Sequence, residues 1–251
     1  MQIPMKNSQM SRVISFINLA GGVGRTTSAV SMAVAFSEYG KRVLLVDLDP
    51  NGGASFSLGL ENPRLSATEI FSGRPRALGM IYKTADRIDV IPANLTLETA
   101  ALKSAGKKDS EYILQKALEN LEYDVIIIDA PATNSYLAKC AVVAADEFII
   151  PTRLDVLSMR GVFSAIELIE KFKKSEKKNY QILPTMVESR NKSQGLISAD
   201  LNSRYGELVL SPGIAKWGGF SEAVGAGKSA LSLFKTSDGA ASYREITYPF
   251  L

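Results

Sequence analysis

The stretch NLAGGVGRTTSAVS, Asn18 to Ser31, lies between a short apolar run and a segment with helical apolar spacing. Its glycines allow the backbone to curl, so that successive N–H groups point at one anion where the following helix begins. The stretch departs twice from the phosphate-binding pattern G-x-x-x-x-G-K-[ST], because Leu19 replaces the first glycine and Arg25 replaces the lysine. The rest of the chain decides whether this loop binds a nucleotide.

On either side of this stretch, runs of apolar and β-branched residues alternate with segments whose apolar residues recur at the spacing of a helix. Pro184 lies in the last of these runs and predicts an irregular end for that strand. Alternation of this kind predicts a mostly parallel, twisted α/β sheet with right-handed crossovers and helices on both faces. We expect strands at 13–19, 43–48, 88–91, 123–131, 147–152 and 180–187, and helices at 26–39, 109–121 and 156–174.

The polar residues that follow these strands predict the position of a site, because ligands of such sheets bind at the carboxyl ends of the strands. Asp47 and Asp49 end the second strand, and Asp129 ends the fourth. Thr26 supplies the hydroxyl expected on Mg²⁺, and Asp129 is placed to hold the water shell of that ion. The residues predicted to bind the nucleotide are Gly21, Gly22, Val23, Gly24, Arg25, Thr26 and Thr27. The alternatives are a tight βα turn for the loop and turn chemistry for the two acids before Pro50.

The composition fits a globular protein, with 46% hydrophobic and 22% charged residues among 251. The net charge of +3 permits a polyanionic partner without requiring one. The chain lacks histidine, which excludes histidine-based zinc sites and His-dependent triads. The single cysteine excludes an internal disulfide framework and suits a reducing compartment.

Domain organisation is predicted to be simple. We expect an N-terminal extension at 1–12, for which disorder is an open alternative, and one domain at 13–251. Either Met1 or Met10 could be the native start. The N-terminus lacks the apolar core of a signal peptide, and no apolar run approaches the roughly 20 residues that span a bilayer.

The segments GGVGRTT, VLLVDLDPNGGAS, VIIIDAP and FSEAVGAGKSA resemble the ParA/MinD family of deviant-Walker ATPases, and the ParA type in particular. The resemblance runs in order over nearly the whole chain and implies a P-loop NTPase fold. It implies ATP and Mg²⁺ as cofactors, with Asp49 orienting the attacking water and Asp47 supporting the magnesium shell. In this reading Arg25 is the catalytic cation of the loop.

The same resemblance implies an ATP-dependent homodimer in the cytoplasm, associated with the nucleoid through DNA bound without sequence preference. A small adaptor protein would stimulate slow hydrolysis, and the dimer would partition plasmids or chromosomes. Carboxysome positioning is an alternative, and so is a nucleotide-dependent adaptor that has lost hydrolysis.

The loop also departs from the family pattern. The family's signature lysine, which reaches the partner's nucleotide, is replaced here by Ala20, as in the carboxysome-positioning branch. Arginine at position 25 keeps the positive charge with a different shape. We expect Arg160, at the start of the helix after the fifth strand, to supply the missing trans cation, with Arg153 as the competing candidate.

Basic residues near the carboxyl end are the candidates for DNA contacts in the ParA resemblance. They lack the spacing needed to read bases, so binding should involve the phosphate backbone and depend strongly on salt. The short tail SYREITYPFL is interrupted by Pro249 and has no basic face, so we expect no membrane partner. We expect Trp217 to be packed or to lie at an interface, and Cys140 to lie in the core. The candidate DNA-binding residues are Arg190, Arg204, Lys216 and Lys228.

Overall fold

A computed structural model describes residues 11–73, 77–173 and 179–251. Its centre is a seven-stranded sheet in the order β3-β4-β2-β5-β1-β6-β7. All neighbouring strands are parallel except β3 and β4. The strands are β1 (Arg12–Phe16), β2 (Val43–Asp47), β3 (Tyr82–Lys83), β4 (Asp89–Ile91), β5 (Val125–Asp129), β6 (Glu147–Arg153) and β7 (Tyr180–Thr185).

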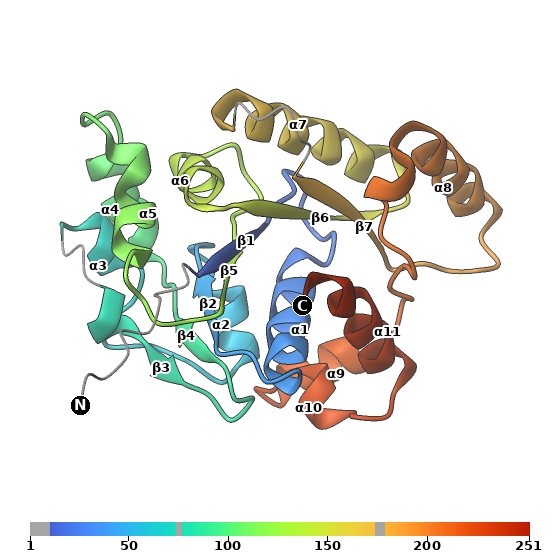
Figure 1. Ribbon diagram of the computed structural model, residues 1–251, viewed down its shortest axis with the longest axis horizontal. Helices are drawn as coiled ribbons and strands as arrows, with labels where there is room; N and C mark the ends of the chain where they lie inside the picture. The colour runs from blue at the N-terminus through green and yellow to red at the C-terminus, as the bar shows by residue number, and fades with distance from the viewer. Residues whose placement is uncertain (1–10, 74–76, 174–178) are drawn as a thin grey trace, which may run out of the picture.

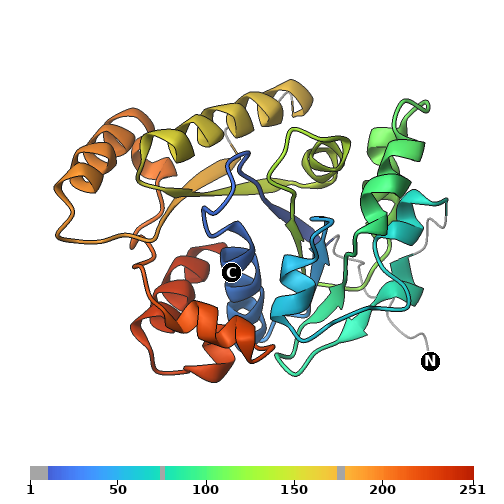
Figure 2. The same ribbon diagram turned by 180° about the vertical axis from the view of Figure 1, so that it is seen from behind.

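Helices cover both faces of this sheet (Figure 1), and the reverse view shows the same two layers (Figure 2). One core joins the sheet to α1 and α11, and a second joins it to α3–α7. The α-helices are α1 (Arg25–Glu38), α2 (Gly53–Ser57), α3 (Thr68–Phe71), α4 (Thr96–Ser104), α5 (Ile113–Leu118), α6 (Tyr136–Ala144), α7 (Val156–Phe172), α8 (Lys192–Tyr205), α9 (Gly219–Gly225), α10 (Ala230–Leu233) and α11 (Asp238–Thr247). The 3₁₀ turns are η1 (Ala77–Met80), η2 (Ser110–Tyr112), η3 (Gly206–Leu208) and η4 (Tyr248–Phe250).

The central strands are apolar because helices cover both of their faces. Strands β2 and β5 are buried along their whole length, including the aspartates that end them. Asp47 and Asp129 are register partners across these two strands. The sheet thus brings together carboxylates that lie far apart in the sequence.

The predicted fold class is confirmed, and the element bounds differ in a few places. Strand β1 begins at Arg12, inside the range predicted as an N-terminal extension, while residues 1–10 lie outside the described part of the chain. The helix predicted at 109–121 is a 3₁₀ turn followed by the short α5. The antiparallel β3 was not predicted, because a strand of two residues is too short to show an alternation of apolar and polar side chains. Strand β7 ends one residue after Pro184, and Met186 follows with a φ of 50°.

The carboxyl-terminal segment packs on the face of α1. Tyr243 of α11 is buried, and its hydroxyl lies 2.9 Å from the Ser28 Oγ on α1. Phe250 near the chain end is buried as well. Within the described ranges, no helix combines the length and apolar character that a membrane crossing needs.

The single tryptophan is packed, as expected. Trp217 makes edge-to-face contacts with Phe220 and Phe234, at centroid distances of 5.1 and 5.2 Å. A Cβ atom on Gly239 would lie 2.9 Å from the Trp217 ring, so a glycine is needed there. Cys140 is fully buried in the core, and burial raises the pKa of its thiol to about 12.

Candidate nucleotide-binding site

The glycine loop connects β1 to α1 and bends through two left-handed residues. Gly22 has a φ of 68° and Gly24 a φ of 75°, values that side chains other than glycine rarely adopt. Helix α1 then begins at Arg25 with Gly24 as its N-cap. Thr185 at the end of β7 donates a hydrogen bond of 2.8 Å to the Val23 carbonyl, so a neighbouring strand fixes the loop.

Asn18 fixes the entry to the loop, a role that sequence reasoning missed. Its Nδ2 donates to the Pro151 carbonyl at 2.7 Å, and its Oδ1 accepts from the Ala20 N–H at 2.8 Å. The side chain is fully buried. The sequence could have indicated this role, because a polar residue within the apolar run 13–19 is expected to be buried and buried polar groups need hydrogen-bond partners.

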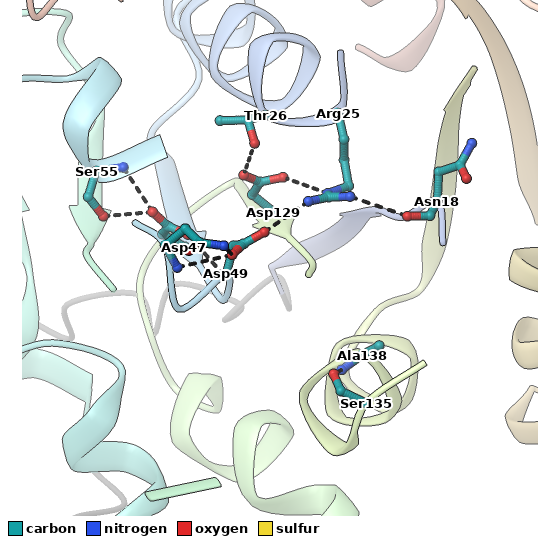
Figure 3. Close-up of polar contacts among 10 residues, drawn as sticks. Asn18, Arg25, Thr26, Asp47, Asp49, Ser55, Asp129, Ser135 and Ala138 are labelled. Atoms are coloured by element: carbon teal, nitrogen blue, oxygen red, sulfur yellow. Dashed lines mark hydrogen bonds and ion pairs between the residues drawn. The ribbon is translucent and has the colours of Figure 1, made fainter. Parts of the chain in front are cut away.

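Arg25 points toward Asp49, Asp129 and the Asn18 carbonyl (Figure 3). Its Nη2 donates to Asp49 Oδ2 at 3.1 Å, and its Nη1 donates to the Asn18 carbonyl at 3.2 Å. Its Nε lies 3.3 Å from Asp129 Oδ1. The side chain is only 8% exposed, so these charges interact with little screening by water.

Thr26 and Asp129 form the second part of the site. The Thr26 hydroxyl donates to Asp129 Oδ2 at 2.7 Å, and Asp129 is fully buried. Asp129 Oδ1 has no hydrogen-bond partner among the described residues. This oxygen instead faces Arg25 Nε. Its position beside a hydroxyl at the start of a helix fits a magnesium ion with its waters.

The described residues contain no group of three acidic or thiol side chains that could hold a metal alone. Magnesium commonly binds through one or two protein oxygens together with substrate phosphates and water. The pair of Thr26 and Asp129 therefore suits a magnesium that arrives with a nucleotide.

Asp47 makes bonds within the protein in this structure. Its Oδ2 accepts from the N–H and the hydroxyl of Ser55 at 2.9 and 2.7 Å, and its Oδ1 accepts from the Asp49 N–H at 3.1 Å. Burial, and then the charge of Asp129, raises the pKa of Asp47 to about 7. Burial also raises the pKa of Asp129, and the charge of Arg25 opposes that rise. Asp47 thus anchors the turn that carries Asp49, and its role toward magnesium stays a prediction.

Helix α7 touches the loop at the position of the missing lysine. A Cβ atom on Gly161 would lie 2.7 Å from the Ala20 Cβ and 2.8 Å from its nitrogen, and closer still to Asn18 Oδ1. Arg160 precedes Gly161 and is exposed. It lies one turn inside α7, which begins at Val156, so the prediction that Arg160 starts the helix was wrong by one turn. The competing Arg153 is paired with Asp155 at 3.1 Å.

The DNA candidates lie on other elements. Arg204 on α8 pairs with Asp200 at 2.9 Å, and Lys216 pairs with Glu188 at 3.1 Å. Arg190 is exposed just before α8. Lys228 lies on the loop between α9 and α10, where it lines a cavity at the far end of α1. The structure does not gather these four residues into the glycine-loop site.

Comparison with known proteins identifies the family. A family model described as an AAA domain matches residues 11–182. The chain is 32% identical over 238 residues to the chromosome-partitioning ATPase Soj of Thermus thermophilus, covering 94% of this chain and 93% of that protein. The chain belongs to the ParA/MinD family of ATPases. This ParA/MinD protein is also 29% identical over 245 residues to the sporulation initiation inhibitor protein Soj of Bacillus subtilis, covering 94% and 97% of the two chains.

Solved structures agree with the fold. A cobyrinic acid a,c-diamide synthase from Mycobacterium smegmatis with ADP and magnesium matches with a TM-score of 0.83 and 30% identity, covering 96% of this ParA/MinD chain and 94% of that one. McdA of Cyanothece in complex with ATP matches with a TM-score of 0.85 over 96% of both chains. Its identity of 21% shows the fold alone. The expected cofactors, ATP and Mg²⁺, agree with what these structures contain.

The contact between α7 and the loop leads to a first prediction. Gly161→Ala would push a methyl group into Asn18 and Ala20, and overpacking of this kind costs about 1–3 kcal/mol. We expect urea unfolding to show that loss. Gly195→Ala in α8 is the matched control, because nothing lies within 4 Å of its added Cβ. Equal stability of the Gly161 variant and the parent would contradict the packing described here.

Proposed function

We propose that this ParA/MinD protein is an ATPase that dimerises around ATP·Mg²⁺ and positions cargo on DNA. The observation that carries this proposal is the assembly of a glycine loop, Thr26, Asp129 and Asp49 at one sheet edge. In this proposal the loop N–H groups hold the phosphates, and Thr26 with Asp129 holds the magnesium. Asp49 orients the water, and Asp47 supports the shell through the turn that it anchors.

Arg25 has two positions in the proposed cycle. In this structure its guanidinium pairs with Asp49 and Asp129, so both acids are occupied. The phosphates then compete for the guanidinium, which can engage two phosphate oxygens at once. When Arg25 moves to the phosphates it frees Asp49 for water and Asp129 for the magnesium shell.

The dimer is supported by the surface beside the loop. Val156 and Leu157 in the first turn of α7 are 70% and 73% exposed, and large apolar side chains exposed side by side often mark an interface. Arg160 lies one turn further on, next to the contact of Gly161 with Ala20. A cation on α7 therefore lies near the position that carries the signature lysine in the resembled family. We propose that Arg160 replaces that lysine in trans.

Arg160→Ala should abolish dimerisation in the presence of a non-hydrolysable ATP analogue, because two polyanionic nucleotides would face each other without a bridging cation. Monomer affinity for the analogue should stay within a few fold. Analytical ultracentrifugation measures the first quantity and calorimetry the second. Arg153→Ala is the matched control and should do less, since Arg153 pairs with Asp155 in its own chain. A dimer that persists without Arg160 would refute the assignment.

We propose that DNA binds through the exposed cations Arg190, Arg204 and Lys216, on α8 and in the segments next to it. Exposed ion pairs such as those of Arg204 and Lys216 are worth little, so both side chains can turn to phosphates. Arg190 carries no ion pair in the described part of the chain. Lys228, which lines a cavity on the α1 side, is the weakest of the original candidates.

DNA binding should require ATP and weaken steeply with salt. About five phosphate contacts would cost roughly two to three decades of affinity between 50 and 200 mM salt. Arg190→Ala should weaken binding to all sequences alike and reduce the salt slope by about one. Fluorescence anisotropy with two unrelated duplexes measures this, with Lys116→Ala on α5 as the control. Affinity that is independent of salt or nucleotide would contradict the proposal.

We base the proposed cellular role on the roles named for the relatives. Plasmid or chromosome partition is the function that we propose, with an adaptor protein as activator and the nucleoid as location. Carboxysome positioning is the second candidate, because position 20 lacks the lysine here. The remaining alternative is a nucleotide-dependent adaptor that does not hydrolyse ATP. Phosphate release, measured with and without DNA, distinguishes it from both ATPase roles.

A further inference from the structure

A cavity of about 350 Å³ lies at the carboxyl end of α1, away from the glycine loop at its amino end. Three segments form its wall together with α1: the turn between β3 and β4, the loop before α10, and α10 with the residues that follow it. Each segment contributes one cation, namely Arg87, Lys228 and Lys235. We call this the α1-end cavity. Its volume falls within the range of small-molecule sites.

The acids of the α1-end cavity are already engaged. Glu38 is held by Arg244 through two contacts of 2.6 and 3.0 Å. Asp86 is 4% exposed and accepts from the hydroxyl and the N–H of Ser229 at 3.0 and 3.3 Å. The three cations have no ion-pair partner among the described residues. The three cations are exposed. Arg244 neutralises Glu38, whereas Asp86 keeps its charge because Ser229 is neutral, so the lining keeps an excess of positive charge with Asp86 offsetting one cation.

The helix end does not cancel this charge. Carbonyl groups at a helix carboxyl end carry partial negative charge, but those of Ala35, Phe36 and Ser37 accept from the N–H groups of residues 39–41. The Ser37 hydroxyl donates to the Arg87 carbonyl at 2.9 Å. That bond fixes the Arg87 backbone to the rim of the cavity.

Arg87 lies in the turn between β3 and β4. It has a φ of 61°, a left-handed conformation that glycine or asparagine would adopt at lower cost. Hairpin turns between antiparallel strands often place a residue in this region, and the residue here is a cation that lines the cavity. Arginine is also the side chain best suited to grip phosphate with two donors.

We propose that the α1-end cavity is a second anion site, which binds a small phosphorylated molecule carrying at least two negative charges. The concave shape and the cations drawn from separate segments favour a compact ligand over the extended backbone of a duplex. This inference does not depend on the proposed ATPase cycle, because the cavity shares no residue with the glycine loop.

The test uses pyrophosphate as the probe, titrated by calorimetry into the full chain without magnesium. Arg87→Gly is the decisive variant, because it removes the cation and relieves the left-handed strain together. We expect pyrophosphate affinity at this site to fall about tenfold or more, with stability to urea unchanged or higher. Lys235→Ala should show a similar loss of affinity, and Lys116→Ala should show none.

Two comparisons separate the alternatives. In Arg25→Ala, measured where circular dichroism shows the parental fold, the cavity site should keep its affinity within a few fold. Binding that disappears from the folded variant would assign the probe to the glycine loop and overturn the proposal. Lys235→Ala should leave the affinity for a 20-bp duplex within about twofold. Equal losses for duplex and pyrophosphate would mean that these cations serve DNA, which also overturns it. Dimerisation with an ATP analogue should be unchanged, so this site and the proposed function fail independently.

Discussion

Asp49→Ala is expected to slow ATP hydrolysis by about a hundredfold or more, since removing a positioned acid–base group costs about 10²–10⁴ in rate. The structure adds a second expected effect. Asp49 Oδ2 holds Arg25, so the variant releases the guanidinium to the phosphates. ATP should therefore bind at least as tightly as in the parent, and the dimer should accumulate. Phosphate release and gel filtration with ATP measure the two effects.

Asp49→Asn is the matched control for this experiment. Its amide oxygen can still accept from Asn51, which now donates to Asp49 Oδ1 at 3.0 and 2.9 Å. The charge that orients water and holds Arg25 is removed, so hydrolysis should fall as it does in the alanine variant. A monomer in the presence of ATP, or hydrolysis at the parental rate, would exclude the proposed role of Asp49.

Arg25→Ala is expected to weaken ATP binding about a hundredfold and to destabilise the nucleotide-free protein as well. The variant leaves Asp129 fully buried and Asp49 without their cation. Breaking a buried ion pair in this way costs about 3–5 kcal/mol. Urea unfolding and calorimetry measure the two losses. Arg25→Lys keeps the charge and should recover most of both.

The stability loss of Arg25→Ala should also depend on pH. Burial raises the pKa of Asp129, and the charge of Arg25 holds that rise in check. Without Arg25 the folded pKa moves further above the unfolded value of about 4. Between the unfolded and the folded pKa, the folded state binds a proton that the unfolded state has lost, so the free energy of unfolding falls as pH rises toward the folded pKa. The loss in free energy of unfolding relative to the parent should therefore be larger at pH 8 than at pH 5.5. A loss that shrinks with rising pH would contradict the pairing of Arg25 with Asp129.

The fold class, the positions of the six longer strands along the chain and the loop with its acids could be predicted from the sequence. Local patterns carry that information, because apolar runs, glycines and strand-end carboxylates are read from neighbouring residues. Asp47, Asp49 and Asp129 were placed at one edge because parallel strands end together. The short β3 was missed, since two residues are too few for a pattern.

The order of the strands in the sheet and the direction of Arg25 became known only from the folded structure. The same holds for the partners of Asn18 and for the contact of α7 with Ala20. It also holds for the cavity lined by Arg87, Lys228 and Lys235. These features depend on contacts between segments far apart in the chain. The pairing of Arg25 with Asp49 and Asp129 is one such case. A charge pattern in sequence gives no angle or distance, so the partner of a buried guanidinium is fixed only when packing excludes water from around it.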